Sequence, residues 1–186
     1  MTVYCTTQDV ATFLGSGVNI NDPALAPIVT NINQAVDTYL ARNILSATYN
    51  ESYRGLGTPR FLLNNVPVTA ITSLTILGQA ILPTTSPFQP GFMFDSERGM
   101  VEVVGYGPIP TWPGAISIAY TAGYAAVPDD LVQAAIEWAA FKYKTKDKIG
   151  VQSKTLDRET VTYSQHAMPM SVKSTLNLYR DMRIYR

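Results

Sequence analysis

The apolar residues follow helical spacing at both ends of the chain and strand-like alternation in the middle. They recur every three or four positions over residues 25–40 and 131–143, which predicts amphipathic helices. Residues 6–14 predict a shorter helix, because Thr6 and Asp9 stand at the spacing of a capping box. Between residues 49 and 124, alternation, β-branched side chains and frequent Pro and Gly predict six or seven short antiparallel strands. This order predicts an α+β fold, a helical core of about four helices with an inserted antiparallel β region.

We expect this pattern to form a single domain over residues 1–186. Its expected parts are listed from the N-terminus as N-terminal helices (1–48), a β insertion (49–125), a central helix (126–150), a polar loop (151–170) and a C-terminal docking helix (171–186). In the last part, Val172, Leu176, Tyr179 and Met182 fall on one helical face. An isolated helix this short is marginal in water, so it needs a surface to lie on.

The stretch 128–150 predicts a helix with too much apolar surface for one packing partner. Its apolar residues cover more than half of the cylinder, which is wider than the stripe of a one-sided surface helix. Asp129 and Asp130 stand at its beginning and four lysines near its end, both favourable for the helix dipole. We therefore expect a central helix, buried against the other helices and the β insertion. The simplest interpretation of the four lysines is a solvated helix end whose charge matches the helix dipole.

Charge is low and unevenly spread along the chain. Charged residues make up 15% of the sequence and the net charge is zero. Residues 1–141 hold four basic and ten acidic residues, whereas residues 142–186 hold ten basic and four acidic ones. Such a chain can complement itself head to tail, or present its basic end to an acidic partner. A nucleic-acid-binding protein is more often basic overall.

Few residues suggest a reactive centre. Cys5 is the single cysteine, so no intrachain disulfide can form, and His166 is the single histidine. No metal-ligand spacing, nucleophile elbow or phosphate-binding loop is present. Glu97 and Glu102 are candidates for a catalytic carboxylate pair, although outward-facing positions on neighbouring strands explain them better. We predict a protein that is not an enzyme, with no catalytic, metal or cofactor site.

Four aromatic residues of the predicted β region could bind sugars or bases; they are Tyr106, Trp112, Tyr120 and Tyr124. Positions in the core or at an interface explain them better, because they fall in strands and turns. The N-terminus lacks a charged region followed by an apolar one, so we expect no secretion signal. No apolar run approaches the length of a membrane span, and we expect no membrane partner.

Two stretches of the sequence resemble one known family. The run ISIAYTAGYAAVPDDLVQAAIEWAAFKYKTKDKIG (116–150) resembles the C-terminal half of head-to-tail connector (adaptor) proteins of tailed phages, in which a strand ending in Tyr-x-Ala-Gly-Tyr precedes a proline-started helix. The run RFLLNNVPVTAITSLTILG (60–78) resembles the strand pair upstream in that family. The polar run DRETVTYS (157–164) resembles the loop that follows the helix. Together they cover about half of the chain.

This resemblance implies a structural role in the virion. Family members form rings of about a dozen copies beneath the portal protein, and extend the channel through which DNA passes to the tail. It implies a homo-oligomeric ring with three contacts: the portal, a downstream tail or tail-completion protein, and genomic DNA that passes without specific binding. It also implies a place in the neck between head and tail, after assembly in the host cytoplasm, and no enzymatic activity.

The expected partner-binding residues lie in the basic C-terminal quarter. Toward the portal or a neighbouring subunit we expect Lys142, Lys146, Lys148, Tyr179, Arg180, Arg183 and Arg186. Two other function classes stay open. One is a nucleic-acid-binding packaging factor that uses these basic residues on phosphates. The other is a small hydrolase or carbohydrate-binding module that uses the β insertion.

Overall fold

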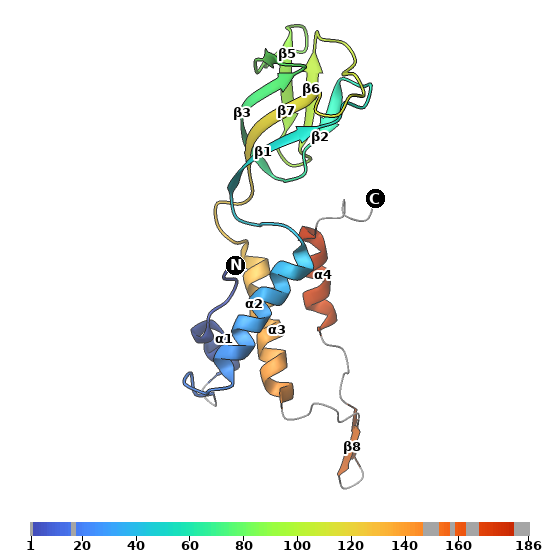
Figure 1. Cartoon of the computed structure of the whole chain (residues 1–186). Helices are drawn as coiled ribbons and strands as arrows, with labels where there is room; N and C mark the ends of the chain where they lie inside the picture. Colours follow the sequence, from blue (N-terminus) through green and yellow to red (C-terminus); the bar gives the residue numbers. More distant parts are fainter. Residues whose placement is uncertain (1, 16–17, 147–152, 157–158, 163–167, 181–186) are drawn as a thin grey trace. The chain divides into compact units, whose positions relative to one another are not determined.

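The computed structural model divides the chain into two compact units (Figure 1). It describes residues 2–15, 18–146, 153–156, 159–162 and 168–180. The helical unit comprises Met1–Arg42 and Val127–Arg186, and the β unit comprises Asn43–Ala126. The predicted fold class is confirmed, since helices precede and follow an inserted β region along the chain. The single domain expected over residues 1–186 stays a prediction.

The helical unit contains α1 (Thr7–Leu14), α2 (Leu25–Leu40), α3 (Asp129–Thr145) and α4 (Met170–Tyr179). The predicted capping box is confirmed at α1, where Thr6 accepts the Asp9 N–H and the Asp9 carboxylate accepts the Thr6 N–H. Pro27 lies inside the first turn of α2, where no helical partner for its missing N–H exists.

Helix α3 is the central helix of this unit, as the sequence predicted. It packs against α1, α2 and α4 (Figure 1). Its buried positions are Leu131, Ala134, Ala135, Trp138, Ala139 and Ala140. The alanines let the neighbouring helices approach closely, and Trp138 supplies the large side chain of the row. The central helix was expected over residues 126–150; it ends at Thr145, and residues 147–150 lie outside the described residues.

An extended N-terminal segment is fastened to α2 by a buried polar side chain. The Asn33 Oδ1 atom accepts the N–H groups of Tyr4 and Cys5 at 3.0 and 3.1 Å, and its Nδ2 donates to the Cys5 carbonyl at 3.0 Å. One turn later Asp37 accepts the Tyr4 hydroxyl at 2.7 Å and the Thr2 N–H at 3.1 Å. Residues 2–5 therefore form a strap along α2.

The β unit consists of seven antiparallel strands, within the six or seven that the sequence predicted. A four-stranded sheet has the order β1 (Ala47–Tyr53), β7 (Ile116–Ala122), β3 (Val68–Ile76), β4 (Gln79–Ile81). A three-stranded sheet has the order β2 (Arg60–Leu62), β6 (Met100–Val104), β5 (Gly91–Asp95). Apolar side chains of both sheets form one buried cluster.

The first and last strands of the β unit leave it side by side. Leu45 and Tyr124 form a parallel bridge, in which Ser46 N–H donates to the Tyr124 carbonyl and Tyr124 N–H to the Ile44 carbonyl, both at 2.8 Å. Gly123 has a φ of +115°, and a Cβ there would lie 2.6 Å from the Leu45 carbonyl oxygen. The close approach of the two segments thus requires glycine.

Two segments differ from the sequence-based expectation. The expected polar loop contains a hairpin of β8 (Ser153–Leu156) and β9 (Glu159–Thr162). These strands lack the apolar alternation by which strands are recognised. The C-terminal docking helix was expected over residues 171–186, but α4 ends at Tyr179, because Arg180 has an extended backbone (φ −65°, ψ 138°).

Candidate interaction surfaces

The structure describes four of the seven expected partner-binding residues, and these four form two groups. Lys148, Arg183 and Arg186 lie outside the described residues. Lys142 and Lys146 lie at the C-terminal end of α3, whereas Tyr179 and Arg180 end α4 beside the beginning of α3. The two groups are about 20 Å apart along α3, at 1.5 Å per residue. They therefore do not form one site.

At the basic end of α3, Lys146 is engaged within the chain. Its Nζ lies 3.1 Å from the Asp22 carboxylate and 4.1 Å from the centre of the Tyr143 ring. The Tyr143 hydroxyl also donates to Asp22. This hydrogen bond, with that of the Ala24 N–H and that of Lys146, lowers the pKa of Asp22 to about 2. The cluster fixes the segment before α2 to the end of α3.

At the other end, the last turn of α4 is tied to α2 and α3. The Tyr179 hydroxyl donates to Asp130 at 2.7 Å, and the Tyr39 hydroxyl donates to Asn177 at 2.7 Å. The Arg180 guanidinium lies over the Tyr39 ring, 5.0 Å from its centre. Val172 and Leu176, two side chains of α4 itself, are fully buried. Residues 170–180 thus pack onto the core of their own chain.

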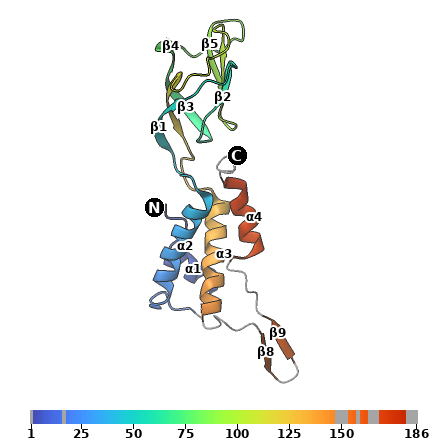
Figure 2. The same ribbon diagram turned by 45° about the vertical axis from the view of Figure 1, so that its right-hand side comes forward.

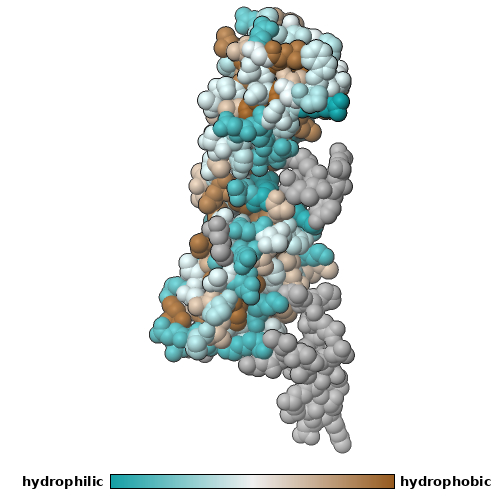
Figure 3. Space-filling model, viewed as in Figure 1, coloured by the Kyte–Doolittle hydropathy of each residue, from teal (hydrophilic) through white to brown (hydrophobic). Residues whose placement is uncertain are grey.

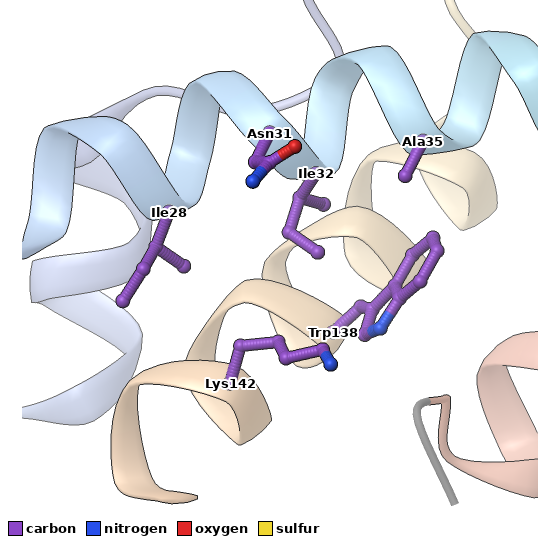
Figure 4. Close-up of a pocket in the computed structure, with 6 residues that line it drawn as sticks. All are labelled: Ile28, Asn31, Ile32, Ala35, Trp138 and Lys142. Carbon is purple, nitrogen blue, oxygen red and sulfur yellow. The ribbon is translucent and has the colours of Figure 1, made fainter. Parts of the chain in front are cut away.

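Lys142 borders an open apolar groove between α2 and α3 (Figure 4). The groove has a volume of about 290 Å³ and is lined by Ile28, Asn31, Ile32, Ala35, Trp138 and Lys142. No acidic partner of the Lys142 ammonium is found among the described residues. Of the expected residues, Lys142 is thus one that the structure leaves beside an open surface.

A second apolar surface lies at one end of the β unit. Strands β1 and β3 finish where β7 begins, so the segments that follow β1 and β3 and precede β7 meet at this end. We call it the apolar loop end; its exposed side chains are Leu56, Leu77, Tyr106 and Trp112. Figure 3 shows separate hydrophobic patches on the surface of the β unit. Exposed apolar patches of this kind commonly mark protein contacts.

The β4–β5 loop carries a further exposed aromatic ring, that of Phe88, which is 93% exposed. Its backbone is held by turn hydrogen bonds, in which the Ser86 hydroxyl accepts the Phe88 N–H and Thr84 accepts the Ser86 N–H. Sequence reasoning did not single out Phe88 or Leu56. Pro87 and Pro90 around Phe88 were the available signal, because an apolar residue in a proline-rich turn has no strand or helix face to bury it.

The polar clusters of the β unit have structural explanations. The Glu51 carboxylate accepts hydrogen bonds from the hydroxyls of Tyr53 and Tyr120 and from the Asn65 amide. Burial, together with the contact to Glu51, raises the pKa of both tyrosines above their usual range, so their hydroxyls remain donors. The cluster fixes the loop between β2 and β3.

The candidate catalytic residues Glu97 and Glu102 do not form a carboxylate pair. Glu102 pairs with Arg60 at 2.8 Å, whereas Glu97 lies in the turn after β5. His166 lies outside the described residues. Within the described ranges, no group of His, Cys, Asp and Glu side chains could hold a metal ion. In the same part of the chain, no helix is long and apolar enough to cross a membrane.

Comparison with known proteins places this geometry in context. The family model of head completion proteins matches residues 4–182. This match confirms the prediction of a structural protein rather than an enzyme. No curated protein matches the chain.

The fold is similar to chains of two solved particle necks. One comes from the neck of a native gene transfer agent (GTA) particle computed with C12 symmetry; it has a TM-score of 0.51 and 22% identity, over 87% of this chain and 84% of that chain. The other comes from the neck of an empty GTA particle computed with C6 symmetry; it has a TM-score of 0.54 and 22% identity, over 98% of this chain and 94% of that chain. At this level of identity the likeness concerns the fold.

Proposed function

Because the chain belongs to the head completion protein family, we propose that it is a neck subunit that joins the head of a phage-like particle to its tail. The family match over residues 4–182 carries this proposal, since it includes both units. In this role the chain is an adaptor, which binds beneath the portal and extends the channel toward the tail. The fold of the two GTA neck chains supports the location.

The adaptor acts as a ring of identical copies. The similar chains come from necks computed with C12 and C6 symmetry, which supports a copy number that is a multiple of six. A ring requires each subunit to present two different, complementary faces. The uneven charge supports such faces, because acidic residues dominate positions 1–141 and basic residues dominate positions 142–186.

The apolar loop end and Phe88 supply contacts to other neck proteins. The stretch 105–115 around Tyr106 and Trp112 contains no charged residue. An uncharged aromatic surface suits a protein partner, whereas a surface for DNA would offer Lys and Arg to phosphates. We assign these contacts to the portal above or to the tail-completion protein below.

The C-terminal residues beyond Arg180 form the remaining contact. Arg183 and Arg186 are proposed to reach carboxylates of the portal, because the planar guanidinium pairs with carboxylate through two parallel hydrogen bonds. Tyr179 and Arg180 anchor this segment, through Asp130 and Tyr39.

Removal of the chain from a particle-producing cell tests the proposal. We expect filled heads without tails, and restoration of tailed particles when the chain is supplied from a plasmid. Electron microscopy of purified chain mixed with portal should show a ring that forms on the portal. Tailed particles made without the chain would overturn the proposal. Tight, salt-sensitive binding of duplex DNA by the purified chain would instead favour a packaging factor.

A further inference from the structure

The helical unit presents two different faces on opposite sides of the α2–α3 pair. Helix α1 packs against α3 and α2 on one side, and α4 packs against the same two helices on the other (Figures 1 and 2). Two unlike faces on opposite sides are what a head-to-tail ring contact requires.

The face that carries α4 is only partly covered. Helix α4 has 10 residues and α3 has 17, so α4 spans about 15 Å beside a helix of about 25 Å. Because Tyr179 binds Asp130 at the beginning of α3, α4 does not extend along the C-terminal part of α3, and no other described helix covers that part on this side. The groove of Ile28, Ile32, Ala35 and Trp138 lies there, and thereby continues the apolar seat of α4 (Figure 4).

This groove has the size and charge of a receptor for one side chain. Its volume of about 290 Å³ is at the low end of small-molecule pockets, and suits a single aromatic ring. Lys142 borders it, and none of the described residues supplies an acidic partner for its ammonium. A fitting occupant therefore combines an aromatic ring with a carboxylate.

The opposite face carries this combination on α1. Phe13 is 50% exposed there, although Val10 and Ala11 of the same helix are buried. Asp9 precedes Phe13 by four positions, and so lies on the same face of the helix. Its Oδ2 atom accepts from Thr6, whereas no donor to Oδ1 is found among the described residues.

We propose that a second copy of the chain places Phe13 of its α1 in this groove, with Asp9 directed to Lys142. The exposed ring fills the continuation of the α4 seat, and the two charges select the register. The contact joins the α1 face of one copy to the α4 face of the next. It therefore repeats in one direction and closes as a ring. This proposal rests on the ring proposed above and names the surface that builds it.

The Phe88 ring is 93% exposed, but it fits the groove less well than that of Phe13. Phe88 lies in the stretch 82–91, which contains no charged residue and would leave Lys142 unpaired. Burial of an unpaired ammonium is unfavourable. Charge complementarity therefore favours Phe13 as the occupant.

Disulfide trapping in the full-length chain tests the contact. The double variant Thr12→Cys with Ala35→Cys, which places a thiol at an exposed position beside Phe13 and keeps the ring, is oxidised at about 10 µM and resolved on a non-reducing gel. A docked contact raises the effective concentration of the two thiols to the millimolar range, so we expect intermolecular ladders to form about 100-fold faster than by random collision. The matched control pairs Leu178→Cys with Ala35→Cys, because Leu178 is 80% exposed and lies on α4.

The charge pair is tested in the same background. Lys142→Glu should slow the ladder at least about tenfold, which corresponds to the loss of about 1.4 kcal/mol. Adding Asp9→Lys to Lys142→Glu should restore fast ladder formation, because the charge pair is then reversed. If Asp9 acted only in the capping box of α1, its replacement could not restore the ladder. Ladders no faster than the control pair, a disulfide formed within one chain, or a reversal that restores nothing would each overturn the proposal.

The outcome is separable from that of the proposed function. If the wild-type chain is found in particles but the double-cysteine variant forms no intermolecular disulfide, either in solution or in particles, the proposed contact is overturned and the neck role stands. Rapid trapping by a chain that is absent from particles would overturn the neck role and leave the self-contact standing.

Discussion

Replacing Asn33 by alanine should loosen the N-terminal strap and destabilise the helical unit. The substitution removes three hydrogen bonds of 3.0–3.1 Å, and leaves the N–H groups of Tyr4 and Cys5 and the Cys5 carbonyl without these partners. Both residues are 2% exposed, so water cannot replace the amide while the strap stays in place.

The magnitude follows from the cost of buried polar groups. Each unsatisfied group costs about 1–3 kcal/mol, so three give roughly 3–9 kcal/mol if the strap stays rigid. Release of the strap limits the loss, because its polar groups then reach water while the buried Tyr4 side chain loses its apolar contacts, worth roughly 2–3 kcal/mol. We therefore expect a loss of about 2–4 kcal/mol in the free energy of unfolding of the helical unit.

Urea unfolding followed by Trp138 fluorescence measures this loss. Trp138 belongs to the helical unit, and a Trp112→Phe background removes the other tryptophan, which is 62% exposed in the β unit. Asn31→Ala is the matched control, because it makes the same chemical change on an exposed position of α2 and should cost less than about 0.5 kcal/mol. Equal stability of the two variants would refute the strap as a source of stability.

Three further predictions concern protonation, reactivity and the C-terminus. The pKa of Asp22 is lowered to about 2 from its ordinary 3.8, so its contribution to stability is present above pH 4 and lost as the pH falls toward 2. The difference in stability between wild type and Asp22→Asn, measured by circular dichroism, should therefore shrink over that range; a constant difference contradicts the reasoning. Burial raises the pKa of the Cys5 thiol to about 11 from 9.0, so iodoacetamide should label the native chain at pH 8 at least about 100-fold more slowly than the denatured chain. Similar rates would show that the thiol is accessible. Deletion of residues 181–186 leaves the contacts of Tyr179 and Arg180 intact, so the melting temperature should change by less than a few degrees while portal attachment is lost. Normal attachment by the truncated chain would remove the docking role of this segment.

Local patterns in the sequence predicted most of the fold. The capping box of Thr6 and Asp9 and the apolar rows of α2 and α3 are short-range signals, and each was confirmed. The strands of the β unit follow from alternation and turn residues in the same way. The β8–β9 hairpin was missed, because its strands have four residues each and no apolar face.

The interaction surfaces depend on contacts between distant residues. Lys146 pairs with Asp22, which lies 124 positions earlier in the chain, and no local pattern indicates this pair; its expected contact with a partner stays a prediction. Tyr179 likewise meets Asp130, and this pairing fixes how far α4 covers α3. The groove beside Lys142 is left open because α4 is shorter than α3, against which it packs. The periodicity of either helix alone does not reveal this difference.

The clamp at the base of the β unit makes that unit exchangeable as a module. Its first and last segments are joined by the Leu45–Tyr124 bridge, so the chain leaves the helical unit and returns to it at neighbouring points. An insertion closed in this way can be lengthened, replaced or removed, at the cost to its host of only a short loop. Exchange of the β unit would therefore change the apolar loop end and Phe88, while the packing of the four helices on one another stays the same.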